Sequence, residues 1–173
     1  MKSKIIFISG GIRAGKSSYA AALAKKTGLS VTYIATGLKV DRETKKRIDD
    51  HIKTRPRNWF TVEEPVDLIG ALNKTDRPVI IIDCLNFWLA NVMPKMKDNE
   101  ITEYAERFCS ALKKKNAVKI IVSNEVGLSL VSNYSSGRLF QNLLGKVNQI
   151  TAKHADEFYF MVSGIPVKIK PMR

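Results

Sequence analysis

Residues 4–19, KIIFISGGIRAGKSSY, decide the fold of this chain. The first six residues form an almost unbroken apolar run, which is typical of a strand buried on both faces of a sheet. Two glycines and the triplet Gly-Lys-Ser follow, and SSYAAALAKK then has a helical pattern. The stretch therefore predicts a buried strand, a tight glycine-rich turn and a helix over 16–27.

The same alternation of strands and helices continues along the chain. The predicted strands cover 4–9, 31–35, 78–83 and 118–123, and the predicted helices cover 16–27, 41–54, 66–73, 100–115 and 135–154. EFYFMV and IPVKIK around Ser163 and Gly164 predict a terminal hairpin, whereas 84–99 fits either a short helix or a loop. We expect one α/β domain over 1–173, with a mostly parallel sheet flanked by helices and an antiparallel edge.

Composition narrows the class of protein. No apolar run reaches the roughly 18–20 residues that a membrane span needs, and the N-terminus lacks the long apolar segment of a secretory signal. We therefore expect a cytoplasmic protein. Cys84 and Cys109 lack the spacing of metal ligands, so they are predicted to be free buried thiols.

The net charge of +13 would suit either nucleic acid or small polyanions. The basic residues are spread along the chain, with no aromatic–basic repeats of the kind that stack single-stranded bases. We therefore expect no nucleic-acid partner.

GGIRAGKS at 10–17 fits the pattern G-x-x-x-x-G-K-[ST] of a phosphate-binding P-loop, in its required place between a strand and a helix. Gly10, Gly11 and Gly15 let the backbone curl so that its N–H groups point at phosphate oxygens. Lys16 would contact the β- and γ-phosphates, and Ser17 would hold Mg²⁺. The alternative is a glycine-rich turn with an incidental lysine.

Asp83 ends the predicted strand VIIID, at the edge of the sheet where ligands of α/β proteins gather. It is the candidate second ligand of Mg²⁺, directly or through water. Asp83 could instead be the N-cap of the segment that follows, and the two roles are compatible.

The chain has two histidines, and their surroundings differ. His154 lies near the end of a predicted helix, where a structural or solvated role is expected. His51 has Arg47 at i−4 and Arg55 at i+4, which would share one helix face with it. Neighbouring cations favour the neutral imidazole that a nucleophile requires. The spacing alone leaves open whether His51 is catalytic or a surface residue of a basic helix.

Motifs over nearly the whole chain resemble, in order, those of the bifunctional adenosylcobinamide kinase / adenosylcobinamide-phosphate guanylyltransferase family. The similar segments are GGIRAGKSSYA at 10–20, TYIATG at 32–37, RIDDHIKTRPRNWFTVEEP at 47–65, DCLNFWLAN at 83–91, VSNEVGLSLV at 122–131 and the final stretch at 137–170.

This resemblance implies a RecA-like P-loop NTPase fold and assembly as a trimer. It implies a kinase that phosphorylates the aminopropanol hydroxyl of adenosylcobinamide, and a transferase that passes GMP from GTP to the phosphorylated product. His51 would carry the guanylyl group covalently, Mg²⁺ would be the cofactor, and GTP and ATP would be substrates. The implied nucleotide contacts are Gly10, Gly11, Ile12, Arg13, Ala14, Gly15, Lys16, Ser17, Ile34, Ala35, Thr36, Ile52, Lys53, Thr54, Arg55, Glu63 and Asp83.

Other classes of function stay open. A P-loop small-molecule kinase without a covalent intermediate would explain 10–17 and Asp83, but would leave His51 without a role. A RecA-like NTPase stimulated by nucleic acid would use the positive charge. A regulatory nucleotide-binding module would bind tightly without turnover.

Overall fold

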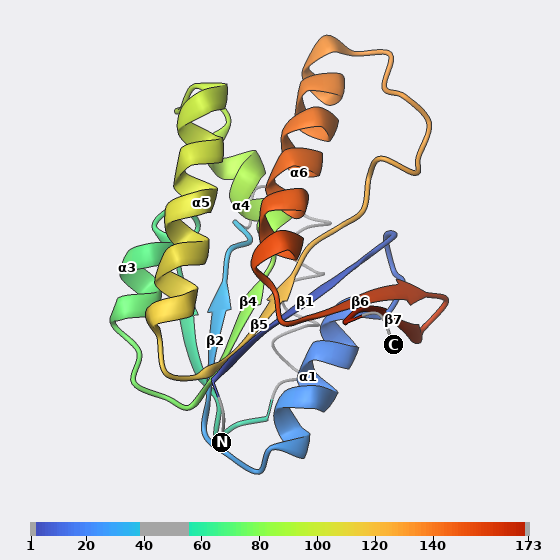
Figure 1. Cartoon of the computed structure of the whole chain (residues 1–173). Helices are drawn as coiled ribbons and strands as arrows, with labels where there is room; N and C mark the ends of the chain where they lie inside the picture. The colour runs from blue at the N-terminus through green and yellow to red at the C-terminus, as the bar shows by residue number, and fades with distance from the viewer. Residues whose placement is uncertain (1–2, 39–55, 172–173) are drawn as a thin grey trace.

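The computed structural model describes residues 3–38 and 56–171, and it is a sheet with helices on both faces (Figure 1). Within the described residues, seven strands lie in the order β3-β2-β4-β5-β1-β6-β7. The strands are β1 (Lys4–Gly10), β2 (Val31–Ala35), β3 (Phe60–Glu63), β4 (Val79–Asp83), β5 (Val118–Val122), β6 (Glu157–Val162) and β7 (Ile165–Lys170). Neighbouring strands pair in parallel except β6 and β7, so the predicted mostly parallel sheet with an antiparallel edge is confirmed.

The helices of the described residues lie on both faces of the sheet. The described helices are α1 (Lys16–Lys26), α3 (Leu68–Asn73), α4 (Leu85–Val92), α5 (Asp98–Lys114) and α6 (Ser135–His154). One hydrophobic core joins α1 to the sheet, and a larger core joins the sheet to α3, α4, α5 and α6 on the opposite face (Figure 1). We call these the α1 face and the α5 face.

The central strands show why apolar runs predicted this sheet. On β4, Val79 and Ile81 pack into the α1 face, while Ile80 and Ile82 pack into the α5 face. All four are fully buried, because successive side chains of a strand point to opposite faces and both faces here are covered.

One strand was not predicted, and the structure decides the segment that fitted either a helix or a loop. β3 was not predicted, since it is a short edge strand whose Phe60, Thr61 and Glu63 are exposed, and it lacks a buried apolar run. The ambiguous stretch 84–99 contains α4, whose Leu85, Trp88, Leu89 and Val92 are buried at helical spacing, and then the start of α5. The helix predicted over 41–54 lies outside the described residues.

The predicted hairpin is confirmed at the end of the chain. Ser163 has a φ of 50° and Gly164 a φ of 86°, which suits the two central residues of a tight β-turn. The Gly164 N–H donates to the backbone oxygen of Ala14 at 3.1 Å, so this turn touches the P-loop.

The remaining sequence expectations concern the cysteines and the membrane. Cys84 and Cys109 are buried and form no disulfide, as predicted. Burial raises the pKa of Cys109 to about 12, which keeps that thiol protonated and unreactive. Among the described helices, none combines the length and the apolar character that crossing a bilayer requires.

Candidate functional site

The loop between β1 and α1 has the geometry of a phosphate cradle. Gly10 has a φ of +146°, and a Cβ there would lie 2.6 Å from the backbone oxygen of Met161 on β6. Gly15 has a φ of +89° and is the N-cap of α1. Both positions therefore favour glycine, and the resulting turn directs the N-terminus of α1 toward the carboxyl edge of the sheet.

Lys16 and Ser17 lie in the first turn of α1. Lys16 is only 8% exposed, and its Nζ donates to the backbone oxygen of Gly11 at 2.6 Å. The ammonium group therefore lies over the loop, where a phosphate oxygen would compete with that carbonyl. Ser17 is half-buried, while Ile12 and Arg13 are exposed on the outside of the loop.

Asp83 ends β4 and pairs with Ala35 on β2 and Val122 on β5. Its side chain follows Ile81 on the α1 face, where α1 packs against β4. The carboxylate accepts a hydrogen bond from the Tyr33 hydroxyl. The N-cap of α4 is Cys84, so Asp83 does not cap that helix.

The donors at this edge of the sheet fit a magnesium ion. Mg²⁺ prefers oxygen ligands, and it is usually held by one or two protein groups together with phosphate oxygens. The Ser17 hydroxyl and the Asp83 carboxylate are such donors, and they come from packed elements on one face of the sheet. Within 3–38 and 56–171, no group of three or more His, Cys, Asp or Glu side chains is placed to hold a metal ion.

The TYIATG segment places its side chains in different surroundings. Ile34 is fully buried in the core of the α5 face, and Ala35 is half-buried beside Asp83. Thr36 is also fully buried, and its hydroxyl accepts from the Cys84 N–H at 2.8 Å and donates to the Cys84 oxygen at 2.7 Å. The side chains of Ile34 and Thr36 therefore build the scaffold of this edge.

Glu63 ends β3, where it pairs with Ala35 and is exposed at the carboxyl edge. The structure thus brings the P-loop, Ala35, Asp83 and Glu63 to the same edge of the sheet. The other predicted site residues, His51, Ile52, Lys53, Thr54 and Arg55, lie outside the described residues.

Sequence reasoning missed two aromatic residues at this edge. Tyr33 contacts Asp83, and Trp59 stacks on Tyr33 with ring centroids 6.3 Å apart and planes 27° apart. A tyrosine two positions before Ala35 could have been suspected from strand register, because residues at i and i+2 share a face.

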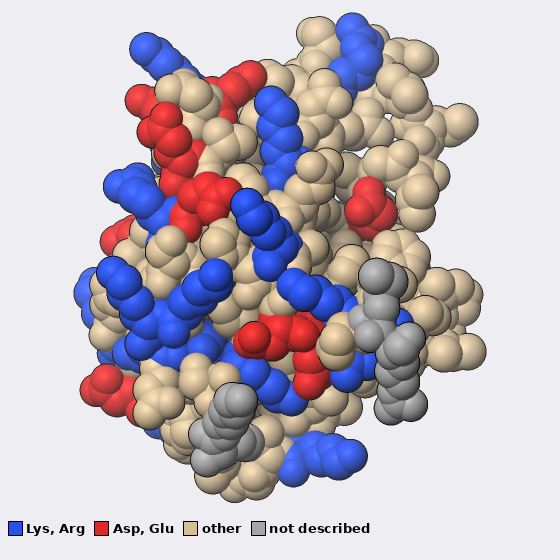
Figure 2. All heavy atoms as spheres, in the orientation of Figure 1, with Lys and Arg blue, Asp and Glu red and all other residues tan. Residues whose placement is uncertain are grey.

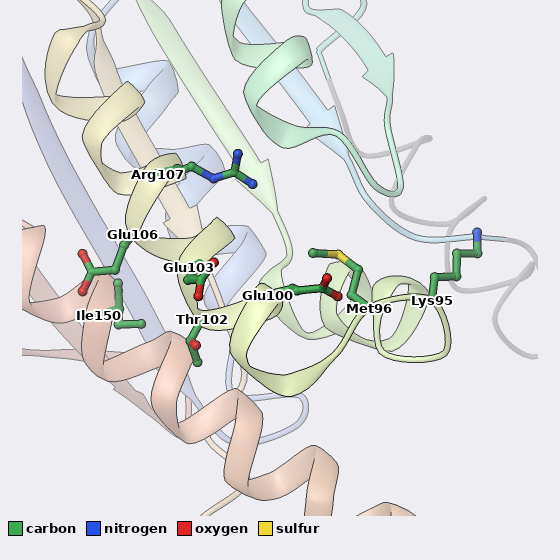
Figure 3. Close-up of a pocket in the computed structure, with 8 residues that line it drawn as sticks. All are labelled: Lys95, Met96, Glu100, Thr102, Glu103, Glu106, Arg107 and Ile150. Atoms are coloured by element: carbon green, nitrogen blue, oxygen red, sulfur yellow. The ribbon is translucent and has the colours of Figure 1, made fainter.

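A pocket lies on the α5 face, away from the P-loop (Figure 3). Its lining residues come from α5, α6 and the turn after α4: Lys95, Met96, Glu100, Thr102, Glu103, Glu106, Arg107 and Ile150. Acidic side chains gather over the first half of α5, whereas basic ones are spread over the rest of the visible surface (Figure 2). The three glutamates outnumber the two cations of this lining, Lys95 and Arg107, so its local charge disfavours a triphosphate.

His154 ends α6 beside this pocket, and its Nε2 lies 2.8 Å from the Glu106 carboxylate. His154 therefore lies at a helix C-terminus, as predicted.

Solved structures similar to this chain share its fold. The flagellar accessory protein FlaH from Methanocaldococcus jannaschii matches with a TM-score of 0.54 and 18% identity, over 98% of this chain and 79% of that chain. A RadB recombinase matches with a TM-score of 0.51 and 14% identity, over 92% and 74%. At such identities these matches establish the fold alone, which is that of RecA-like P-loop NTPases.

Sequence comparisons are more specific. The bifunctional adenosylcobalamin biosynthesis protein CobP of Pseudomonas aeruginosa is 35% identical over 169 residues, which cover 94% of this chain and 95% of that protein. CobU of Escherichia coli, which carries the same description, is 33% identical over 181 aligned positions, covering 96% and 99%. The family model described as cobinamide kinase / cobinamide phosphate guanyltransferase matches residues 6–169. This chain therefore belongs to the cobinamide kinase / cobinamide phosphate guanyltransferase family.

Proposed function

We propose that this chain performs both reactions of its family at one nucleotide site, with His51 as the covalent carrier of the guanylyl group. The family match over residues 6–169 supports a kinase and guanylyltransferase of cobalamin biosynthesis. The observation that carries the single-site proposal is the P-loop, with buried Lys16 above it and Asp83 on the same face of the sheet.

In the kinase reaction, the outer phosphates of a nucleoside triphosphate lie in the P-loop. The aminopropanol hydroxyl of adenosylcobinamide attacks the γ-phosphorus. The bond from that phosphorus to the β,γ-bridging oxygen breaks, and the nucleoside diphosphate leaves. Lys16 and the loop N–H groups offset the negative charge that builds up on the phosphate oxygens.

In the transferase reaction, an imidazole nitrogen of His51 attacks the α-phosphorus of GTP. An N–P bond forms, the bond to the β-phosphate oxygen breaks, and pyrophosphate leaves. A phosphate oxygen of adenosylcobinamide phosphate then attacks the guanylyl-histidine, which gives adenosylcobinamide-GDP and frees His51. Histidine suits this double displacement because its N–P bond is labile.

Two other groups have roles in this proposal. Mg²⁺, held by Ser17 and Asp83, would neutralise phosphate charge. Glu63 would accept the two adjacent N–H donors of guanine, so Glu63→Gln should narrow the preference for GTP over ATP in competition assays. An unchanged preference would remove Glu63 from the guanine site.

The resemblance also suggests a cytoplasmic homotrimer. The segment 126–134 supports association between copies, because four large apolar side chains in it are more than 70% exposed. They are Leu128, Leu130, Val131 and Tyr134.

Labelling with GTP that carries radioactive phosphorus at the α-position tests the covalent step. We expect label on the protein that is stable in base and released by acid. His51→Ala should abolish the label while GTP still binds, and Lys16→Ala should weaken both labelling and binding. His154→Ala is the matched control, since His154 is paired with Glu106 on the α5 face and should label normally.

Two results would favour the other classes of function. A wild-type protein that binds GTP and phosphorylates adenosylcobinamide without becoming labelled would be a kinase with no covalent intermediate. GTP hydrolysis stimulated by DNA or RNA would point to the nucleic-acid-dependent NTPase.

A further inference from the structure

A buried tyrosine contacts the carboxylate that the proposed function assigns to magnesium. Tyr33 is 4% exposed, and its hydroxyl donates to the Asp83 carboxylate. We propose that Tyr33 is a positioning residue, which holds Asp83 so that the carboxylate oxygen not bound by the tyrosine faces the Mg²⁺ of the bound nucleotide. This inference rests on the proposed function, in which Asp83 holds that ion.

The register of the sheet makes the contact possible. Tyr33 on β2 pairs with Ile81 on the adjacent parallel strand β4, and Asp83 lies two residues further along β4. Ile81 and Asp83 share a face, so Tyr33 and Asp83 are diagonal neighbours on the α1 face. A phenol reaches across such a diagonal, whereas Ala35, which pairs directly with Asp83, has no side-chain donor to offer the carboxylate.

The hydrogen bond restricts a torsion that is otherwise loose. The terminal torsion of an aspartate is broad, so an unheld carboxylate presents its two oxygens at many angles. The Tyr33 hydroxyl engages Oδ2, and among the described residues no donor is bound to Oδ1. Fixing Oδ2 therefore sets the direction of Oδ1 before the nucleotide arrives, which reduces the ordering that binding must impose.

Trp59 holds the tyrosine in turn. Its ring stacks on the Tyr33 ring at 6.3 Å, and both side chains pack against the core of the α1 face. The backbone N–H of Trp59 donates to the Pro56 oxygen at 3.1 Å, which closes the turn before β3 that carries this indole. Two side-chain contacts thus connect the Trp59 ring to the Tyr33 ring and the Tyr33 hydroxyl to the carboxylate.

The test measures how much Mg²⁺ tightens the binding of a fluorescent GTP analogue, by comparing its Kd with Mg²⁺ and with EDTA. Tyr33→Phe keeps the buried ring and removes only the donor. We expect it to reduce the tightening by Mg²⁺ about tenfold, as for a hydrogen bond to a charged group, with the Kd in EDTA unchanged. Trp59→Leu should reduce the tightening by a smaller factor.

Tyr159→Phe is the matched control, because the Tyr159 hydroxyl donates to another carboxylate, that of Glu157, at 2.9 Å. It should leave the Mg²⁺ effect intact. The proposal is overturned if Tyr33→Phe leaves the Mg²⁺ effect intact, or if it weakens binding equally with Mg²⁺ and with EDTA. Neither readout involves guanylyl transfer, so a failure of the labelling experiment would leave this result separately interpretable.

Discussion

At the scale of single residues, the junction between β4 and α4 depends on one hydroxyl. Thr36 is fully buried and exchanges two hydrogen bonds with the backbone of Cys84, the residue after Asp83. Asn91 donates to the Thr36 oxygen at 2.8 Å, which ties α4 to the same point. The position of Asp83 therefore depends on a threonine whose side chain faces away from solvent.

Thr36→Val should destabilise the protein measurably. Valine keeps the shape but leaves the Cys84 N–H buried without its acceptor, which costs about 1–3 kcal/mol in the free energy of unfolding. Thr36→Ser keeps the hydroxyl and loses one methyl group, at a cost of about 1 kcal/mol or less. Urea denaturation compares the two variants. Equal losses would show that packing, and not the hydrogen bonds, makes Thr36 matter.

Residues of the site could be predicted from the sequence only where a local pattern specifies them. Gly10, Gly15 and Lys16 form a motif within a few positions, and Asp83 ends an evident strand. Tyr33 and Thr36 act on residues about fifty positions away in the chain, and their contacts depend on how β2 lies against β4. That pairing is a property of the sheet, so the local sequence could not reveal it.

At the scale of elements, the β6–β7 hairpin supports the P-loop. Gly164 in its turn donates to the Ala14 oxygen, and its Cα lies 3.3 Å from where a Cβ on Gly15 would be. The terminal hairpin therefore restrains the loop that is proposed to bind phosphate.

Gly164→Ala tests this support. A side chain at its φ of +86° costs about 1–2 kcal/mol, which shifts the turn away from Ala14. Gly28→Ala is the matched control, because Gly28 also has a positive φ with open space around it but lies in the turn between α1 and β2. Both variants should lose similar stability, and only Gly164→Ala should weaken GTP binding severalfold in titrations. If Gly164→Ala and Gly28→Ala bind GTP equally well, the hairpin does not support phosphate binding by the loop.

A second link joins β1 to β6. The Lys4 ammonium lies 2.9 Å from the Glu157 carboxylate, which also accepts from Tyr159. Burial alone would raise the pKa of Glu157, but these two hydrogen bonds together lower it below the ordinary 4.5. A carboxyl with a lowered folded pKa stabilises the fold above its unfolded pKa, and this contribution is lost as pH falls through the folded pKa.

In Lys4→Met, the free energy of unfolding should therefore decrease less steeply than in the wild type as pH falls. The expected cost at neutral pH is about 0.5 kcal/mol, since the pair is partly exposed and screened by solvent. Thermal unfolding between neutral pH and the folded pKa of Glu157 measures both effects. Lys153→Met removes the same charge from an exposed position on α6 and should keep the wild-type slope. If the stability of Lys4→Met falls with pH as steeply as that of the wild type, the Lys4–Glu157 pair is not the source of this pH dependence.

Elements were predictable to the degree that they are buried or amphipathic. The strands of the sheet centre are apolar runs, and α5 and α6 each bury one stripe of side chains. β3 escaped prediction because it lies at the edge and exposes most of its side chains. Its place beside β2 follows from pairing with Ala35 and its neighbours, which local pattern does not encode.

At the scale of the whole molecule, two opposite surfaces of the sheet have different chemistry. The α1 face ends in the P-loop and Asp83, whereas the α5 face carries the acidic side chains of the first half of α5 (Figure 2). In a chain of net charge +13, this distribution leaves an anionic nucleotide attracted to the molecule as a whole but repelled by one region of its surface.

The segment 126–134 gives the molecule its most exposed apolar surface among the described residues, with Leu130 94% exposed. Gln141 on α6 donates to the oxygens of Val126 and Leu130, so the segment is held in place while its apolar side chains face solvent.

If copies associate through the segment 126–134, light scattering should give a multiple of the 19.4 kDa chain mass, threefold for a trimer. Leu130→Asp should then lower that mass toward one chain, because a buried unpaired carboxylate is costly. Leu29→Asp, on an exposed leucine between α1 and β2, should leave it unchanged. A wild-type monomer, or a Leu130→Asp variant of undiminished mass, would rule out association through this segment.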